Sequence, residues 1–331
     1  SPISLHQSTS QFTNLSTVNC DTHVMEAVQK IGDYPFDITY MCYDESRYEE
    51  FLNVKHDEMK ENFRNLFARV ELDVNCMPEI DIIASPAKHC RQKCRFAIRK
   101  KKDLGISGEH GDELVHAMWD EGKPAVLVEA FPISSIQIYN VMPVLLEKIQ
   151  SSSDYECICC GLASVHYLST LSGALTITMN YDLSNKNSFE DEVNGSKCIW
   201  RIAAERLHSE LIAAVISNVQ SISIIGRTKG VKVVIGADFV NEILHLADGR
   251  SLHYKQVEEG FSNPNSFVNQ RALDWLCSVA QQATTTSGRS ALSEETSSTS
   301  STSTGCGSVD LLEMYCGNGN HTVALAGMSM C

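Results

Sequence analysis

The end of the 331-residue chain carries the pattern best suited to binding a nucleotide-like ligand. The stretch "VDLLEMYCGNGNHTVALA" has a short apolar run and an acid, then two glycines one residue apart, then residues that could start a helix. Glycine lets the backbone approach a ligand without a Cβ in the way, and a following helix N-terminus supplies unpaired N–H groups. The pattern predicts a cofactor loop, with an ordinary strand-to-helix turn as the alternative.

A basic strip suggests a second kind of chemistry, the neutralisation of phosphates. Residues 88–102, "KHCRQKCRFAIRKKK", contain eight Lys or Arg and no acid. On a strand, the period of two would place Arg91, Lys93 and Arg95 on one face. A solvated sheet face that balances an acidic protein is the alternative. The candidate contacts with nucleic-acid phosphates are Lys88, Arg91, Lys93, Arg95, Arg99 and an aromatic stacking partner, Phe96, together with Arg227, Lys229 and Lys232 in a later segment.

The composition limits the other classes of function. The formal net charge of -14 argues against nucleic-acid binding driven by overall charge, so any RNA contact must be local. The longest apolar run, 211–216, is far shorter than the roughly 20 residues that span a bilayer, so we expect no membrane segment. The 13 cysteines are scattered and lack paired zinc-ligand spacing, which predicts reduced thiols and no metal. We therefore expect a cytoplasmic protein, with mitochondrial and nuclear locations left open.

Several elements must position these residues. Apolar residues at helical spacing predict a helix over 48–66, another over 199–219, and a third that begins near Pro264. Beta-type runs occupy 80–84, 94–100 and 124–131. In 174–182, alternation predicts a half-buried strand with Leu175, Ile177, Met179 and Tyr181 on one face. Residues 221–236 predict a hairpin that turns at 228–230.

The chain divides into three parts by composition. We expect residues 1–47 to be an extension that is possibly disordered. We expect 48–255 to form an α+β domain and 256–331 to form the beginning of an α/β domain. Within the last part, 284–309 consist mainly of Ser, Thr and Gly. This segment predicts a disordered insertion, because it has too few apolar groups to offset the entropy of ordering.

The residue sequence of the glycine loop indicates a particular family of proteins. The stretch "LLEMYCGNGNHTVALA" resembles the S-adenosylmethionine-binding motif of the tRNA (uracil-5-)-methyltransferase family. Four earlier stretches are similar to segments of the same family in the same order: "SPAKHCRQKCRF", "HYLSTLSGALTI", "IIGRTKGVK" and "YKQVEEGFSNPNSFVNQRALDW". The resemblance covers roughly residues 48–326.

The resemblance implies a fold and a cofactor. The fold would be an α+β RNA-binding domain followed by the start of a Rossmann-like α/β methyltransferase domain, which is incomplete. The cofactor would be S-adenosylmethionine. Asn263 stands where the family usually has a longer Gln, so direct contact there is less secure. The candidate cofactor-binding residues are Tyr315, Gly317, Asn318, Gly319, Asn320 and Asn263.

The resemblance also implies an activity, the methylation of uridine carbon 5 in the T-loop of tRNA by a protein that acts as a monomer. The family's nucleophilic cysteine and its base follow the cofactor loop in motifs that these residues do not contain. We therefore interpret the chain as a fragment with no catalytic residues and expect no methyl transfer from it alone. The alternatives are a non-catalytic protein that binds tRNA and assists its folding, and a methyltransferase acting on ribosomal RNA.

Overall fold

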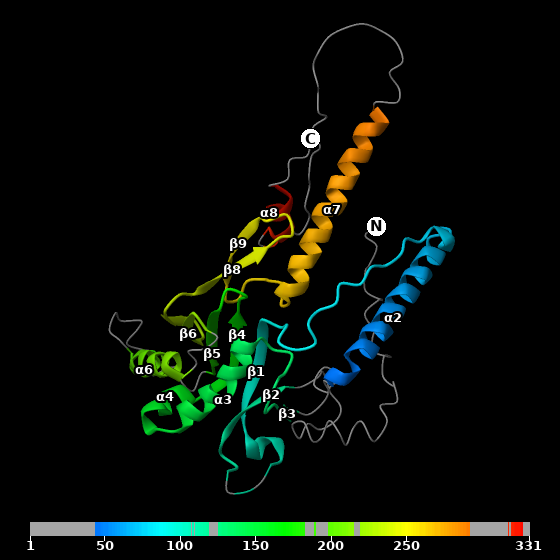
Figure 1. Ribbon diagram of the computed structural model, residues 1–331. Helices are drawn as coiled ribbons and strands as arrows, with labels where there is room; N and C mark the ends of the chain where they lie inside the picture. Colours follow the sequence, from blue (N-terminus) through cyan, green and yellow to red (C-terminus); the bar gives the residue numbers. More distant parts are fainter. Residues whose placement is uncertain are drawn as a thin grey trace, which may run out of the picture.

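The structure is a computed structural model that describes residues 44–106, 108, 110–118, 125–182, 189, 198–214, 219–291, 317 and 319–326, with the backbone alone over 283–291. The expected extension up to residue 43, the insertion from residue 292 onward, Tyr315 and Asn318 lie outside this part of the chain. Figure 1 shows a sheet with short helices beside it and a long helix, α7, that extends away from it.

The main body is a seven-stranded mixed sheet in the order β3-β2-β1-β4-β5-β6-β7. Only β5 and β6 are parallel to each other, and every other neighbouring pair is antiparallel. A parallel pair needs a crossover connection, which α6 (Ile199–Ala214) provides here. The strands are β1 (Lys93–Lys100), β2 (Leu114–Met118), β3 (Val126–Leu127), β4 (Leu162–Ser169), β5 (Ala174–Tyr181), β6 (Ser221–Thr228) and β7 (Val231–Ile235).

Helices pack on one face of this sheet. They are α3 (Ile136–Gln150), the short α4 (Glu156–Cys159) and α6, and they share a core with alternate residues of the strands. The predicted alternation in β5 is confirmed, because Leu175, Ile177, Met179 and Tyr181 all lie in this core. The residues between them point to the opposite face. We call that face the polar face, since its side chains include Lys93, Arg95, Ser164, His166, Thr178, Asn180, Arg227 and Lys232.

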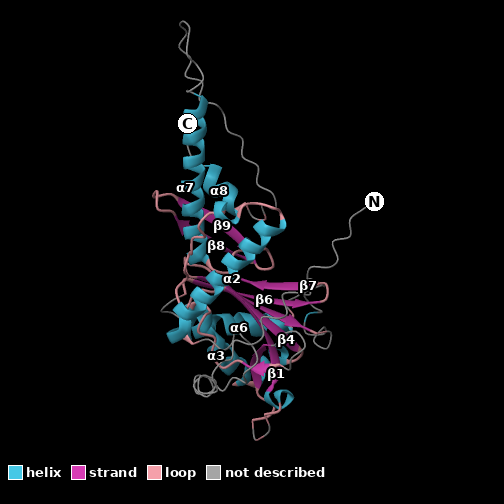
Figure 2. Ribbon diagram, turned by 90° about the vertical axis from the view of Figure 1, so that its right-hand side faces the viewer, coloured by secondary structure: helices cyan, strands magenta, loops and turns pink. Residues whose placement is uncertain are grey.

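A second core lies beyond the sheet. The hairpin of β8 (Phe239–His245) and β9 (Ser251–Val257) packs with α7 (Ser266–Ala291) and α8 (Asn320–Ala326). Figure 2 shows this group at one end of the molecule and the large sheet at the other. The expected boundary at residue 255 falls inside β9, whereas the packing groups both hairpin strands with α7.

The helix predicted over 48–66 is confirmed as α2 (Tyr48–Arg69), none of whose residues is buried. The Tyr48 hydroxyl donates to the Ser85 carbonyl at 2.6 Å, and His56 bonds the Ile80 carbonyl at 2.9 Å. Short 3-10 turns occur at Glu45–Arg47, Val74–Cys76, Lys101–Leu104 and Ser153–Tyr155. None of the helices in the described ranges is both long and apolar enough for a transmembrane segment.

Three local predictions were wrong in part. Residues 80–84 form no strand, because no neighbouring strand pairs with them and a side chain of α2 occupies the Ile80 carbonyl. Of 124–131, only Val126–Leu127 join the sheet, as β3. Helix α7 runs to Ala291, so the start of the expected insertion at 284 is helical.

The buried His116 makes stability depend on pH. Its imidazole bonds the Tyr167 hydroxyl at 2.8 Å, and burial lowers the pKa of His116 to about 3. The unfolded residue has a pKa of about 6.5, so between these values the unfolded state binds the extra proton and stability falls as pH falls. We expect the free energy of unfolding to drop below pH 6.5 with a limiting slope of about 1.4 kcal/mol per pH unit.

Urea unfolding from pH 7 to pH 4.5 measures this slope. His116→Gln should flatten it. The flattening should be partial, because burial and then Arg95 also lower the pKa of His166, to about 4. Equal slopes for the two proteins would contradict the prediction.

Candidate functional site

The glycine loop lies against the second core. Gly317 and Gly319 have φ values of 56° and 75°, in the left-handed region that favours glycine. Asn320 then begins α8, and the Tyr254 hydroxyl on β9 donates to the Asn320 carbonyl at 3.0 Å. The loop is therefore anchored to the hairpin at the point where the chain turns.

Three side-chain amides meet beside this loop. Asn269, in the first turn of α7, exchanges two hydrogen bonds with Asn320: its Nδ2 donates at 2.9 Å and its Oδ1 accepts at 2.8 Å. Asn263 Nδ2 donates to the same Asn269 oxygen at 3.5 Å. The structure thus brings together two predicted cofactor residues, Asn263 and Asn320, through a third residue that the sequence prediction missed. The one signal for Asn269 was an amide among apolar residues near the start of a helix.

The segment 258–264 connects this amide cluster to the sheet. Asn263 accepts a hydrogen bond from the Asn265 backbone at 3.0 Å, and Asn265 in turn caps α7 by accepting from the Val268 backbone at 3.1 Å. Phe261 is 80% exposed, and a Cβ added to Gly317 would lie 3.7 Å from its ring. The segment therefore presents an aromatic ring and an amide towards the glycine loop.

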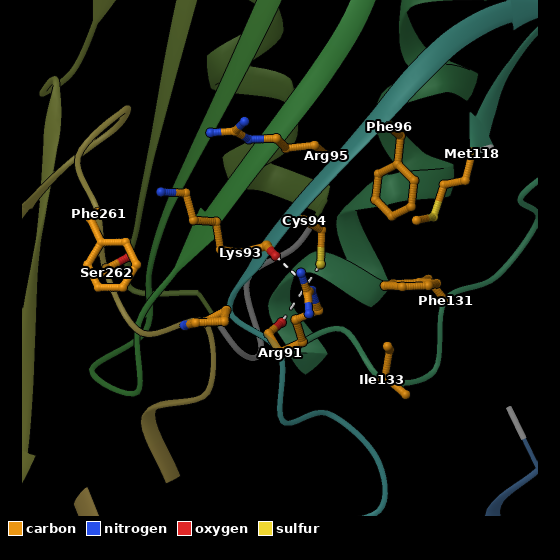
Figure 3. Close-up of a pocket in the computed structure, with 11 residues that line it drawn as sticks. Arg91, Lys93, Cys94, Arg95, Phe96, Met118, Phe131, Ile133, Phe261 and Ser262 are labelled. Carbon is orange, nitrogen blue, oxygen red and sulfur yellow. Dashed lines mark hydrogen bonds between the residues drawn. The ribbon is translucent and has the colours of Figure 1, made fainter. Parts of the chain in front are cut away.

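The polar face of the sheet carries the basic candidates. Figure 3 shows Lys93 and Arg95 projecting from β1 towards Phe261. The strand register places Arg95 opposite His166, and His166 opposite Thr178. Burial and the positive charge of Arg95 hold the pKa of His166 near 4, so its imidazole is neutral at pH 7.

A second row on the polar face brings the hairpin cations into register. Asn180 pairs with Arg227, and Arg227 pairs with Lys232 on β7. Lys229 lies in the exposed turn of that hairpin, which confirms the turn predicted at 228–230. Arg227 and Lys232 are thus brought to the same face as Arg95, whereas Lys229 is not.

The remaining basic candidates lie at the margins. Arg91 precedes β1, and its Nε donates to the Lys93 carbonyl at 3.0 Å, so it does not share the strand face as expected. Lys88 pairs with Glu45. Arg99, near the other end of β1, donates to the Ile98 carbonyl at 2.7 Å.

The structure corrects the expectation for Phe96. It is 1% exposed, and its ring packs edge-on against Phe131 and His116, each at 5.3 Å between ring centroids. Figure 3 shows it projecting from β1 away from Lys93. Because successive residues of a strand point to opposite faces, Phe96 lies on the helix side of the sheet and Arg95 on the polar face. Phe96 is therefore a core residue with no face available for stacking on RNA.

A cavity of about 620 Å³ lies where β1 meets segment 258–264. Its wall combines cations, apolar groups and the exposed ring of Phe261 (Figure 3). The lining includes Arg91, Lys93, Arg95, Phe261, Ser262 and Pro264.

Residues 47–287 match the family model described as tRNA (Uracil-5-)-methyltransferase. The chain belongs to this family. The tRNA/tmRNA (uracil-C(5))-methyltransferase of Aeromonas salmonicida is 33% identical over 271 residues, covering 82% of this chain and 57% of the relative. That of Neisseria gonorrhoeae is 30% identical over 272 residues, covering 81% and 58%. The chain thus spans a little more than half the length of these curated relatives.

One solved structure is also similar, that of the Pyrococcus abyssi tRNA (uracil-54, C5)-methyltransferase in complex with S-adenosyl-L-homocysteine. The TM-score is 0.40 at 13% identity, over 67% of this chain and 48% of that one.

The match to the methyltransferase family includes the whole sheet, the polar face and segment 258–264, and it ends before the glycine loop. Among the described residues, no cluster of three His, Cys, Asp or Glu side chains could hold a metal ion.

Proposed function

We propose that this member of the tRNA (uracil-5-)-methyltransferase family transfers a methyl group from S-adenosylmethionine to carbon 5 of a uridine in the T-loop of tRNA. The observation that carries the proposal is the convergence of Asn263, Asn269 and Asn320 beside the glycine loop, at the end of a segment that begins on the basic polar face. One connected surface thus offers cations to an RNA backbone and amides to a cofactor.

The residues of the loop fit this cofactor. Gly317 and Gly319 keep its backbone free of side chains, and a Cβ at Gly317 would enter the space beside Phe261. Gly317, Gly319 and Asn320 would hold the cofactor, with Asn263 beside them, and Tyr315 and Asn318 remain predicted contacts. When bound, S-adenosylmethionine supplies an electrophilic methyl group.

The polar face supports the RNA part of the proposal. Arg95 is exposed and, within the described residues, forms no ion pair, so its charge is available to a phosphate. Methylation of a uridine ring requires the base to leave its stack, and backbone contacts outside the reacting base must hold the RNA meanwhile. We propose that the sheet provides these contacts, and that the protein acts as a cytoplasmic monomer.

Transfer of tritiated methyl to an unmodified tRNA transcript tests the function. The protein expressed from its native message should produce 5-methyluridine, found by nuclease digestion and chromatography, and a transcript with cytidine at the T-loop position should gain no label. Residues 1–331, assayed beside it, should bind the transcript without transferring methyl. Binding by both proteins with transfer by neither would contradict the proposal and favour the tRNA-binding alternative.

A further inference from the structure

Two of the basic candidates on the polar face are already paired with a buried acid. The side chain of Glu258 is only 4% exposed and lies between Arg227 and Lys232. Arg227 donates through Nε to one Glu258 oxygen and through Nη2 to the other at 3.4 Å. The Lys232 ammonium lies 3.0 Å from that second oxygen. The carboxylate therefore uses both oxygens to join β6 and β7 to the start of segment 258–264.

The same segment is held at two further points. Lys93 donates from Nζ to the Gly260 carbonyl at 2.7 Å, and the Gln92 backbone N–H donates to the Pro264 carbonyl at 2.7 Å. Phe261 and Asn263 lie between these anchors. Cations from β1, β6 and β7 thus fix the segment from which the exposed ring and the amide reach the glycine loop.

Charge balance distinguishes Arg227 and Lys232 from Arg95. A carboxylate that is nearly buried requires partners, and loss of one partner leaves an uncompensated charge. Lys232 also pairs with Asp238 at 3.1 Å, and Arg227 lies 3.4 Å from a Glu259 oxygen. The salt dependence of binding reports how many counterions leave the RNA when protein cations neutralise its phosphates. A cation that is already paired with a carboxylate neutralises few phosphates, so it adds little to this dependence.

We propose that Arg227, Lys232 and Lys93 are positioning residues for the cofactor side of the site. They clasp segment 258–264 to the polar face and so place Asn263 beside Asn269 and Asn320. Arg95, by contrast, contacts an RNA phosphate. The inference assigns a different role to three residues that the sequence pattern favoured as RNA contacts, and it rests on the proposed function for the identity of both ligands.

Two binding measurements separate the roles. The first is the slope of log affinity against log salt for a tRNA transcript, measured with residues 1–331. The second is the dissociation constant of S-adenosyl-L-homocysteine, measured by calorimetry on the protein expressed from its native message. Arg227→Met, Lys232→Met and Arg95→Met keep the aliphatic stem and remove the charge, so Arg95→Met is the matched control.

We expect Arg95→Met to reduce the salt slope by about 0.9, the value for one phosphate contact, and to leave the dissociation constant of the cofactor product unchanged. Arg227→Met and Lys232→Met should leave the slope unchanged and weaken binding of the cofactor product about ten-fold, since small displacements of a binding group are costly. Arg227→Lys should recover most of that loss. Glu258→Gln should weaken binding of the cofactor product by a similar factor, without lowering the salt slope of tRNA binding.

Amide hydrogen exchange checks that the variants fold. Protection in β6 and β7 should persist while residues 258–264 exchange faster. The inference would be overturned if Arg227→Met and Lys232→Met lowered the salt slope of tRNA binding as much as Arg95→Met does. It would also be overturned if neither Arg227→Met nor Lys232→Met changed the dissociation constant of S-adenosyl-L-homocysteine. If the unsubstituted chain does not bind tRNA at low salt, the proposed function fails. The positioning role of Arg227 and Lys232 is still tested in that case, by the binding of S-adenosyl-L-homocysteine and by amide hydrogen exchange in residues 258–264.

Discussion

Gly226→Ala is expected to lower the free energy of unfolding by about 3 kcal/mol, at the upper end of the usual cost of overpacking a core. A Cβ on Gly226 would lie 2.5 to 2.8 Å from three atoms of the Trp200 ring. That ring has no room to move, because it is fully buried, stacked on Phe189 at 5.2 Å and bonded through Nε1 to the Tyr181 hydroxyl at 2.8 Å. The missing side chain on β6 is what allows α6 to approach the sheet.

Urea unfolding of Gly226→Ala, Trp200→Phe and the double variant measures this effect. Trp200→Phe alone should destabilise the protein by leaving a cavity. In the double variant the smaller ring should accept the added methyl group, so the combined loss should be smaller than the sum of the single losses. Strictly additive losses would mean that the two residues do not compete for the same space.

Glu242→Leu is expected to destabilise the protein by about 4 kcal/mol, because one buried carboxyl serves three donors. Glu242 is fully buried and accepts hydrogen bonds from the Leu171 and Ile243 backbones at 2.9 and 3.1 Å and from the Ser266 hydroxyl at 2.8 Å. Leucine of similar size would leave all three donors unpaired. Burial raises the pKa of Glu242, and the three donors oppose that rise.

The effect should extend to the candidate site. Ser266 begins α7, so its release should loosen the turn that carries Asn269. Glu242→Gln keeps an acceptor oxygen and should cost about 1 kcal/mol, the net value of a single hydrogen bond. Thermal and urea unfolding of both variants provide the comparison. Similar losses for Leu and Gln would show that shape, and not hydrogen bonding, determines the contribution of Glu242.

Much of the fold could be predicted from local patterns. The alternation of Leu175, Ile177 and Met179 predicted both the strand β5 and the face that it buries, since a strand in a half-covered sheet repeats every two residues. The apolar spacing over 48–66 predicted α2 in the same way. The wording of the glycine loop identified the family, which the match over 47–287 confirmed.

The roles of individual polar residues were decided only by the tertiary structure. Phe96 and Arg95 are adjacent in sequence, and only the side on which the helices pack decides which of them is buried. The partners that define the site are distant along the chain: Glu258 lies 31 residues from Arg227, and Asn320 lies 51 residues from Asn269. A sequence pattern reports charge and periodicity over one element, whereas the neutralisation of a cation or the pairing of an amide depends on which elements meet. The sequence by itself therefore determined the family and most of the elements, and the packing of segment 258–264 decided which cations of the polar face are paired with a buried acid.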